Sequence, residues 1–119
     1  MTLARVRYLQ RQLSKKYGII GRVASRYLEA GLSVRINHPT RLGPVHIFAQ
    51  GNGQRLVVEV YTSSKPLRPD DIRRAIDKAK LLQAKPVIVI YGKAKNKIVS
   101  KEALDEALSQ QVKIKGIKQ

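Results

Sequence analysis

GPVHIFAQGNGQRLVVEVYTSSK, residues 43–65, holds two apolar segments on either side of a glycine-rich turn. Val45–Ala49 and Arg55–Tyr61 flank a Gly-Asn-Gly run, which is a strong signal for a β-hairpin. One carboxylate, Glu59, interrupts the second strand, and His46 stands in the first. Because Asp and Glu are rarely buried without a partner, Glu59 requires either an ion-pair partner or a function.

The sequence around this hairpin predicts helices before it and a helix–strand–helix series after it. Apolar residues at helical spacing, helix caps and one continuous apolar run mark these elements. The elements expected are a helix over 1–16, a helix opening at Gly21 and ending near Gly31, a strand over 32–36, a helix from Asp70 or Asp71 to about Gln83, a strand over 86–92, a helix beginning near 100, and a tail over 112–119 that is either an edge strand or a loose basic arm.

This order predicts an α/β fold with a mixed central sheet, an antiparallel hairpin over about residues 44–61, and flanking helices. A buried apolar strand that follows a crossover helix pairs in parallel, whereas the hairpin is antiparallel. A chain of 119 residues is long enough for one modest core. We therefore expect a single domain over 1–119, with a basic helix at 1–16 and a basic tail at 112–119.

The charge balance predicts a polyanionic partner. Twenty-four Lys and Arg against eight Asp and Glu give a formal net charge of +16. Such self-repulsion destabilises a compact chain and is relieved by nucleic acid or, as weaker alternatives, by an anionic membrane surface or an acidic protein. There is no cysteine, and two histidines with few acids do not favour a structural metal site. No run reaches membrane-spanning length, so we expect a cytoplasmic, nucleoid-associated protein that binds no membrane.

Two segments resemble a known group of nucleases. YGIIGRVASRYLEAGLSV (17–34) resembles the first helix, and GPVHIFAQGNGQRLVVEV (43–60) the catalytic hairpin, of the restriction-endonuclease-like, PD-(D/E)xK superfamily. Within it the nearest likeness is to archaeal Holliday junction resolvases, and it covers residues 17–92. The resemblance implies a restriction-endonuclease-like core for the whole domain.

The active-site motif of that superfamily is degenerate in this sequence. The resemblance places its helix glutamate at Arg22, its strand aspartate at His46, its second acid at Glu59 and its lysine at Tyr61, with Lys65 four residues further on. Magnesium prefers several oxygen ligands, whereas one carboxylate beside imidazole and guanidinium favours a phosphate diester. We therefore expect no catalytic residues, no metal and no cofactor; magnesium enters only if the chain is an active resolvase-like endonuclease.

Plainer interpretations remain open. Glu59 can be a buried carboxylate paired with Arg55, Arg22 or another base, and His46 a structural histidine. LRPDDIRRAIDKAKLLQAKPVIVIYG (67–92) also resembles the C-terminal half of archaeal tRNA-splicing endonuclease subunits. There Lys85 matches the family's lysine, but Phe48 or Ala49 would replace its tyrosine and Gly53 would lie near its histidine. That resemblance implies a structural, RNA-binding subunit.

The sequence thus favours a nucleic-acid-binding protein on a nuclease-like fold that has lost its metal-dependent site. One phenylalanine and no tryptophan argue against stacking of single strands, so backbone contacts to duplex or branched DNA are favoured over RNA. A homodimer would lengthen the basic surface. The expected nucleic-acid-binding residues are Arg5, Arg7, Arg11, Lys15, Lys16, Arg22, Arg26, Arg35, Arg41, Lys65, Arg68, Lys93, Lys95 and Lys97, with further bases Arg73, Arg74, Lys78 and Lys80 on the crossover helix.

Overall fold

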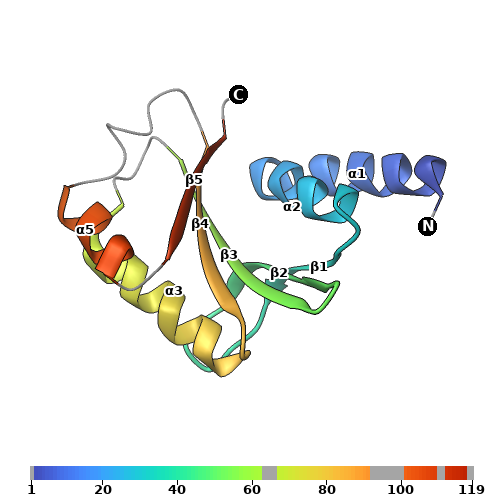
Figure 1. The fold of residues 1–119 in the computed structure, drawn as a ribbon. Helices are drawn as coiled ribbons and strands as arrows, with labels where there is room; N and C mark the ends of the chain where they lie inside the picture. Colours follow the sequence, from blue (N-terminus) through green and yellow to red (C-terminus); the bar gives the residue numbers. More distant parts are fainter. Residues whose placement is uncertain (1, 63–66, 92–100, 110–111, 118–119) are drawn as a thin grey trace.

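The computed structural model describes residues 2–62, 67–91, 101–109 and 112–117, and shows a sheet with helices on both faces (Figure 1). The elements are α1 (Leu3–Tyr17), α2 (Ile19–Glu29), β1 (Ser33–His38), β2 (Val45–Gly51), β3 (Gln54–Thr62), α3 (Pro69–Leu81), β4 (Lys85–Tyr91), α5 (Lys101–Ser109) and β5 (Lys113–Ile117).

The sheet is five-stranded and mixed, in the order β1-β2-β3-β4-β5. β1 pairs with β2, and β2 with β3, in antiparallel fashion, whereas β3–β4 and β4–β5 are parallel. The predicted α/β class, with a mixed sheet flanked by helices, is confirmed. The tail adopts the first of its two expected conformations, because β5 forms an edge strand beside β4.

The expected hairpin through the Gly-Asn-Gly run forms between β2 and β3, and its turn has two central residues. Asn52 and Gly53 both have positive φ, 52° and 74°, and Gly51 pairs with Gln54. Positive φ at both central residues defines the type I′ turn, whose twist matches that of the two strands. The turn therefore fixes the register that carries Glu59 to its place on β3.

Alternate residues of the strands serve two separate cores. On β4, Val87 and Val89 join the core beneath α2, whereas Ile88 and Ile90 join the core beneath α3 and α5. This alternation explains the continuous apolar sequence of β4, since both of its faces are covered. The helices α1 and α2 accordingly lie on one side of the sheet and α3 and α5 on the other (Figure 1).

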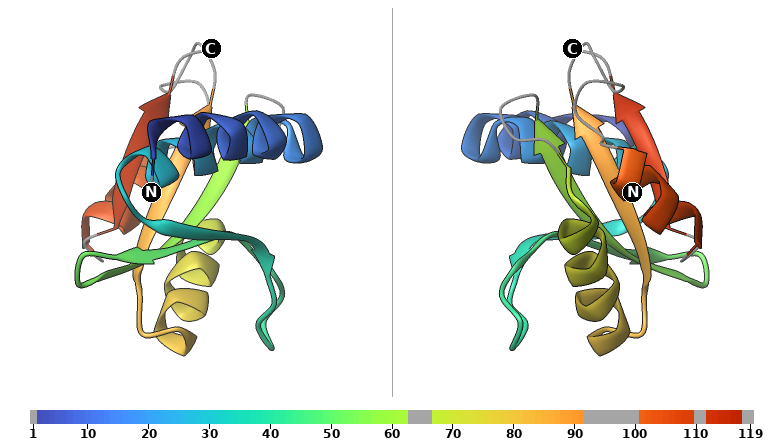
Figure 2. Two further views of the ribbon diagram at one scale, coloured as in Figure 1. Left: turned by 90° about the vertical axis from the view of Figure 1, so that its right-hand side faces the viewer. Right: turned by 90° about the vertical axis from the view of Figure 1, so that its left-hand side faces the viewer.

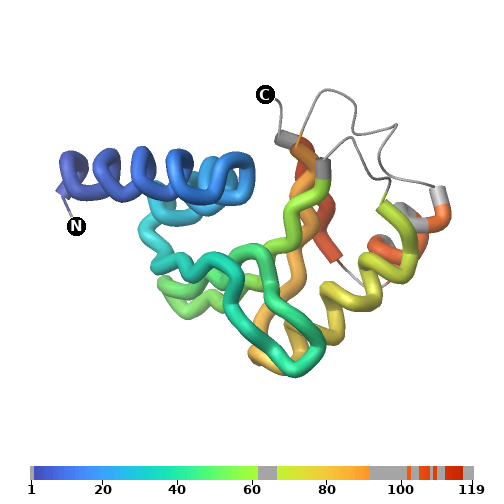
Figure 3. The backbone as a smooth tube through the Cα atoms, turned by 180° about the vertical axis from the view of Figure 1, so that it is seen from behind, coloured from blue at the N-terminus to red at the C-terminus, as the bar shows by residue number. Residues whose placement is uncertain are grey.

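The helix α1 packs on α2 and extends beyond the sheet (Figure 3), and none of its side chains is fully buried. Gly18, at φ 59°, separates the two helices. The second helix begins at Ile19, so the expected start at Gly21 is wrong. Gly21 instead lies inside α2, where a Cβ atom would overlap the carbonyl oxygen of Leu13. Glycine thus permits a close approach of the two backbones.

In the described ranges, no helix has the length and apolar character needed to cross a membrane.

Gly21→Ala tests this close approach. Alanine inside an exposed helix normally stabilises by up to about 1 kcal/mol relative to glycine. Here we expect a loss of about 1–3 kcal/mol in the free energy of unfolding, because α1 must move away to admit the methyl group. Urea denaturation followed by circular dichroism measures the change, and a stabilised variant would refute the close contact.

Candidate nucleic-acid interface and the Glu59 pocket

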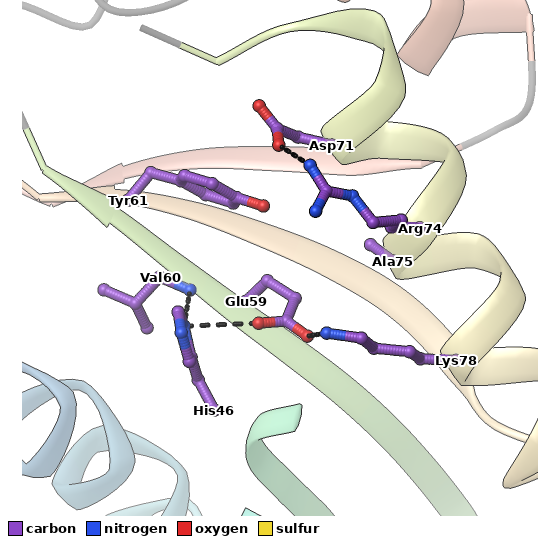
Figure 4. A pocket seen from close by; sticks show the side chains of 8 residues that line it. All are labelled: His46, Glu59, Val60, Tyr61, Asp71, Arg74, Ala75 and Lys78. Carbon is purple, nitrogen blue, oxygen red and sulfur yellow. Dashed lines mark hydrogen bonds and ion pairs between the residues drawn. The ribbon is translucent and has the colours of Figure 1, made fainter. Parts of the chain in front are cut away.

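A pocket of about 360 Å³ lies between the hairpin strands and α3 (Figure 4). The strands contribute His46, Glu59 and Tyr61, and α3 contributes Asp71, Arg74 and Lys78. The lining residues of α3 are three or four positions apart, so they lie along one side of the helix; they are Asp71, Arg74, Ala75 and Lys78. Three of the four positions that correspond to the nuclease motif therefore meet in this pocket.

Glu59 is buried and paired with a lysine. Its side chain is 5% exposed, and its Oε1 lies 3.4 Å from Nζ of Lys78. The same ammonium donates a hydrogen bond to the carbonyl oxygen of Pro44 at 3.0 Å. A buried carboxylate is tolerated when a cation and further hydrogen bonds surround it. The partner is thus Lys78, where the sequence offered Arg55, Arg22 or another base.

The imidazole of His46 takes the place of a backbone hydrogen-bond partner between β2 and β3. The paired residues of β2 and β3 extend from the turn to Ile47 and Val58, and beyond them the N–H of Val60 donates to Nδ1 of His46 at 2.8 Å. Oε2 of Glu59 lies 3.2 Å from that same nitrogen. A neutral imidazole nitrogen that accepts a hydrogen bond carries no proton, so the neutral ring has its proton on Nε2. In that tautomer Lys78 alone neutralises Glu59.

Tyr61 remains a neutral hydroxyl at physiological pH. Burial raises the pKa of this phenol well above its usual value; the carboxylates of Asp71 and Glu59 add to the rise, and Arg74 opposes it. Asp71 itself pairs with Arg74 at 2.8 Å and accepts a hydrogen bond from the backbone N–H of Arg68 at 2.9 Å. Both carboxylates of the pocket are therefore already engaged by cationic side chains.

This arrangement presents several hydrogen-bond donors. Nε2 of His46, the hydroxyl of Tyr61 and the ammonium of Lys78 can all donate. Within the part of the chain that the structure describes, no group of three or more His, Cys, Asp or Glu residues could hold a metal ion.

Arg22 lies away from this pocket. It belongs to α2, which packs on the opposite face of the sheet, and its Nη1 donates to the hydroxyl of Tyr91 at 3.4 Å. The structure therefore brings His46, Glu59 and Tyr61 together and separates Arg22 from them. Sequence alignment could not reveal this, because it shows the order of the elements but not the face on which a helix packs.

The two helices on Arg22's side form a strongly basic surface. They carry seven basic residues and one acid, Glu29, and every one of those bases is exposed. An open groove of about 550 Å³ runs between the helices and is lined by Arg7, Arg11 and Arg22. Gln10, which also lines it, donates to Ser25 and Glu29 and so joins the helices. The bases of this surface, named here the α1–α2 face, are Arg5, Arg7, Arg11, Lys15, Lys16, Arg22 and Arg26.

The acidic residues gather on the other side. Apart from Glu29, all the acids lie on α3, on α5 or at Glu59. Every ion pair within the described ranges involves α3 or Glu59. Arg73 pairs with Asp70 and Glu106, and Arg74 and Lys78 are also paired, so these bases of the crossover helix are neutralised locally.

The other expected binding residues are scattered. Arg35 is exposed on β1, Arg41 is exposed in the loop before β2, and Arg68 is exposed at the start of α3. The remaining four, Lys65, Lys93, Lys95 and Lys97, lie outside the described residues. The sequence interpretation did not assign Asp71 to the pocket, although its helical spacing with Arg74 and Lys78 was a usable signal.

No protein-family model and no curated protein matches the sequence. Two solved structures resemble the chain: a protein of unknown function, AF1548, with a TM-score of 0.59, 19% identity and 79% of this chain covered, and SfsA of Pyrococcus furiosus in complex with Ca²⁺, with a TM-score of 0.55, 18% identity and 91% covered. The matched regions span 54% and 57% of those proteins. These likenesses concern the fold alone, and they are compatible with a nuclease-like core.

Lys78→Met should destabilise the protein, because it leaves the Glu59 carboxylate buried without its ammonium. We expect a loss of about 3 kcal/mol in the free energy of unfolding, measured by urea denaturation. Adding Glu59→Gln to Lys78→Met removes the uncompensated charge and should restore part of the loss. Equal stability of wild type and Lys78→Met would show that the contact contributes nothing.

Tyr61→Phe should reduce the decrease in the free energy of unfolding that occurs at alkaline pH. Because the folded-state pKa of Tyr61 is raised, its contribution to stability is complete below the unfolded value of about 10 and is lost as pH rises above it. Denaturation between about pH 9 and pH 11.5 measures the slope. Tyr8→Phe, at an exposed position on α1, is the control, and an unchanged slope in Tyr61→Phe would refute the assignment.

Proposed function

We propose that this protein binds nucleic acid through the phosphate backbone, using the α1–α2 face, and that DNA is preferred over RNA. The observation that carries the proposal is the segregation of charge across the sheet. The α1–α2 face exposes seven bases with one acid, whereas α3 and α5 carry most of the acids. A polyanion would therefore approach the α1–α2 face and avoid the opposite side.

The spacing of the bases suits contact with a continuous backbone. Arg7, Arg11 and Lys15 follow at four-residue intervals on α1, and Arg22 and Arg26 do so on α2. Residues four apart lie on one side of a helix and about 6 Å apart along its axis. Each base that neutralises a phosphate releases counterions, which gives affinity without base recognition.

We further propose that binding does not serve metal-dependent cleavage at Glu59. The support is the contact with Lys78, whose ammonium lies against the carboxylate that would otherwise attract a divalent cation. A magnesium ion would have to displace this ammonium and would then find one carboxylate beside an imidazole. Incision of branched DNA with magnesium, abolished by Glu59→Gln, would overturn this part of the proposal.

The proposal includes a homodimer, because two copies would join their basic faces into a longer surface for one duplex. Light scattering coupled to gel filtration measures the mass of the free protein and of its complex. A monomer in both states would remove this element while leaving the binding proposal intact.

The direct test removes three positive charges from the groove between α1 and α2. In Arg7→Gln/Arg11→Gln/Arg22→Gln, the slope of log affinity against log salt should become shallower by about one for each phosphate that the variant no longer neutralises, and affinity should fall strongly. Fluorescence anisotropy with a duplex of about two helical turns measures both quantities.

The matched control is Arg73→Gln/Arg74→Gln/Lys80→Gln, which removes the same charge from exposed positions on α3. It should retain the wild-type slope. Equal losses in the two variants would show that net charge alone drives binding. In competition at fixed salt, a preference for structured RNA over duplex and four-way-junction DNA would overturn the choice of DNA and favour the RNA-binding alternative.

A further inference from the structure

We infer that the sheet surface at the start of β4 and along β5 is a second phosphate-binding surface, which extends the one on α1 and α2. This inference rests on the proposed function. Its basis is an open concavity of about 520 Å³ whose charged lining consists of Lys85, Lys113 and Lys115, with Leu56, Ala84, Pro86 and Val87 among the other lining residues. We call these three lysines the β4–β5 lysines.

The β4–β5 lysines lie on the same side of the sheet as α2. Lys85 alternates with Val87 and Val89, which belong to the core beneath α2. In the parallel register of β5, Lys113 pairs with Val87 and Lys115 with Val89, and paired residues point to the same face. Lys115 also places its Nζ 5.9 Å from the ring centre of Tyr27 on α2. The basic surface thus continues from the helices onto the strands.

Among the described residues, no helix packs over the start of β4 or over β5 on that side, although Val87 and Val89 further along β4 are buried. The helix α2 makes its main strand contacts with β1 and β2. Figure 2 shows α1 and α2 across the end of the sheet where β3, β4 and β5 finish, away from the start of β4. Lysine replaces the apolar side chains that a covering helix would require at 113 and 115. Lysines also protect an exposed edge strand from pairing with other chains. That role needs charge at the edge, but it does not need a third lysine on β4 lining the same concavity.

Arg22 and Lys85, near opposite ends of β4, are separated by a length suited to one duplex. Arg22 contacts Tyr91 at the end of β4, and Lys85 begins that strand. Six residue steps at about 3.3 Å give about 20 Å. Because duplex DNA rises about 3.4 Å per base pair, this corresponds to about six base pairs. A longer duplex can therefore contact both regions together, whereas a much shorter one cannot.

The test is Lys85→Gln/Lys113→Gln, which changes two exposed residues, compared with Arg73→Gln/Lys80→Gln on α3 as a charge-matched control. On a duplex of about two helical turns, we expect the lysine variant to lower the salt slope by about two and the control to leave it unchanged. On a hairpin duplex of about four base pairs, the lysine variant should bind as tightly as wild type, since that ligand cannot span both regions.

Two failures are distinguishable. If Lys85→Gln/Lys113→Gln keeps the wild-type slope on the long duplex while the Arg7, Arg11 and Arg22 substitutions abolish binding, the β4–β5 lysines only protect the edge and this inference is wrong. If wild type binds neither duplex at physiological salt, the proposed function fails and the inference fails with it. Equal effects of the lysine variant and the control would also refute it, because net charge would then account for both.

Discussion

Eight carboxylates are too few to neutralise twenty-four basic side chains, so their positions determine which bases remain available to a ligand. The fold collects all of them except Glu29 on one side of the sheet. Glu59 on β3 forms an ion pair with Lys78. Arg73 and Arg74 form ion pairs with Asp70, Asp71 and Glu106. The opposite helices keep one acid among seven bases. An anionic partner would relieve repulsion within that cationic side, which connects the distribution of charge to the proposed function.

The Glu59 pocket explains how this core accommodates a buried carboxylate. The ammonium of Lys78 lies beside the carboxylate, and the imidazole of His46 accepts a hydrogen bond from the backbone N–H of Val60. These contacts join β2, β3 and α3, so the pocket stabilises the frame. The basic helices across the sheet are then positioned by a separate constraint, the close approach at Gly21.

The sequence predicted local structure well, because local signals specify it. The Gly-Asn-Gly turn determined the hairpin, and the apolar run of β4 indicated a strand covered on both faces. The sequence was a weaker guide to which side chains meet in the folded protein. The partner of Glu59 depends on how α3 packs over β3, and the position of Arg22 depends on which face of the sheet α2 covers. Neither follows from spacing along the chain, although the helical interval between Arg74 and Lys78 indicated a shared side.

The most direct measurement of the central claim is a titration of ¹⁵N-labelled protein with duplex DNA, followed by amide chemical shifts at several salt concentrations. We expect salt-sensitive changes in amide chemical shift along α1 and α2 and around the β4–β5 lysines, with α3 and α5 unaffected. Changes centred on α3, α5 or the Glu59 pocket, with the first two helices silent, would contradict the proposed binding surface.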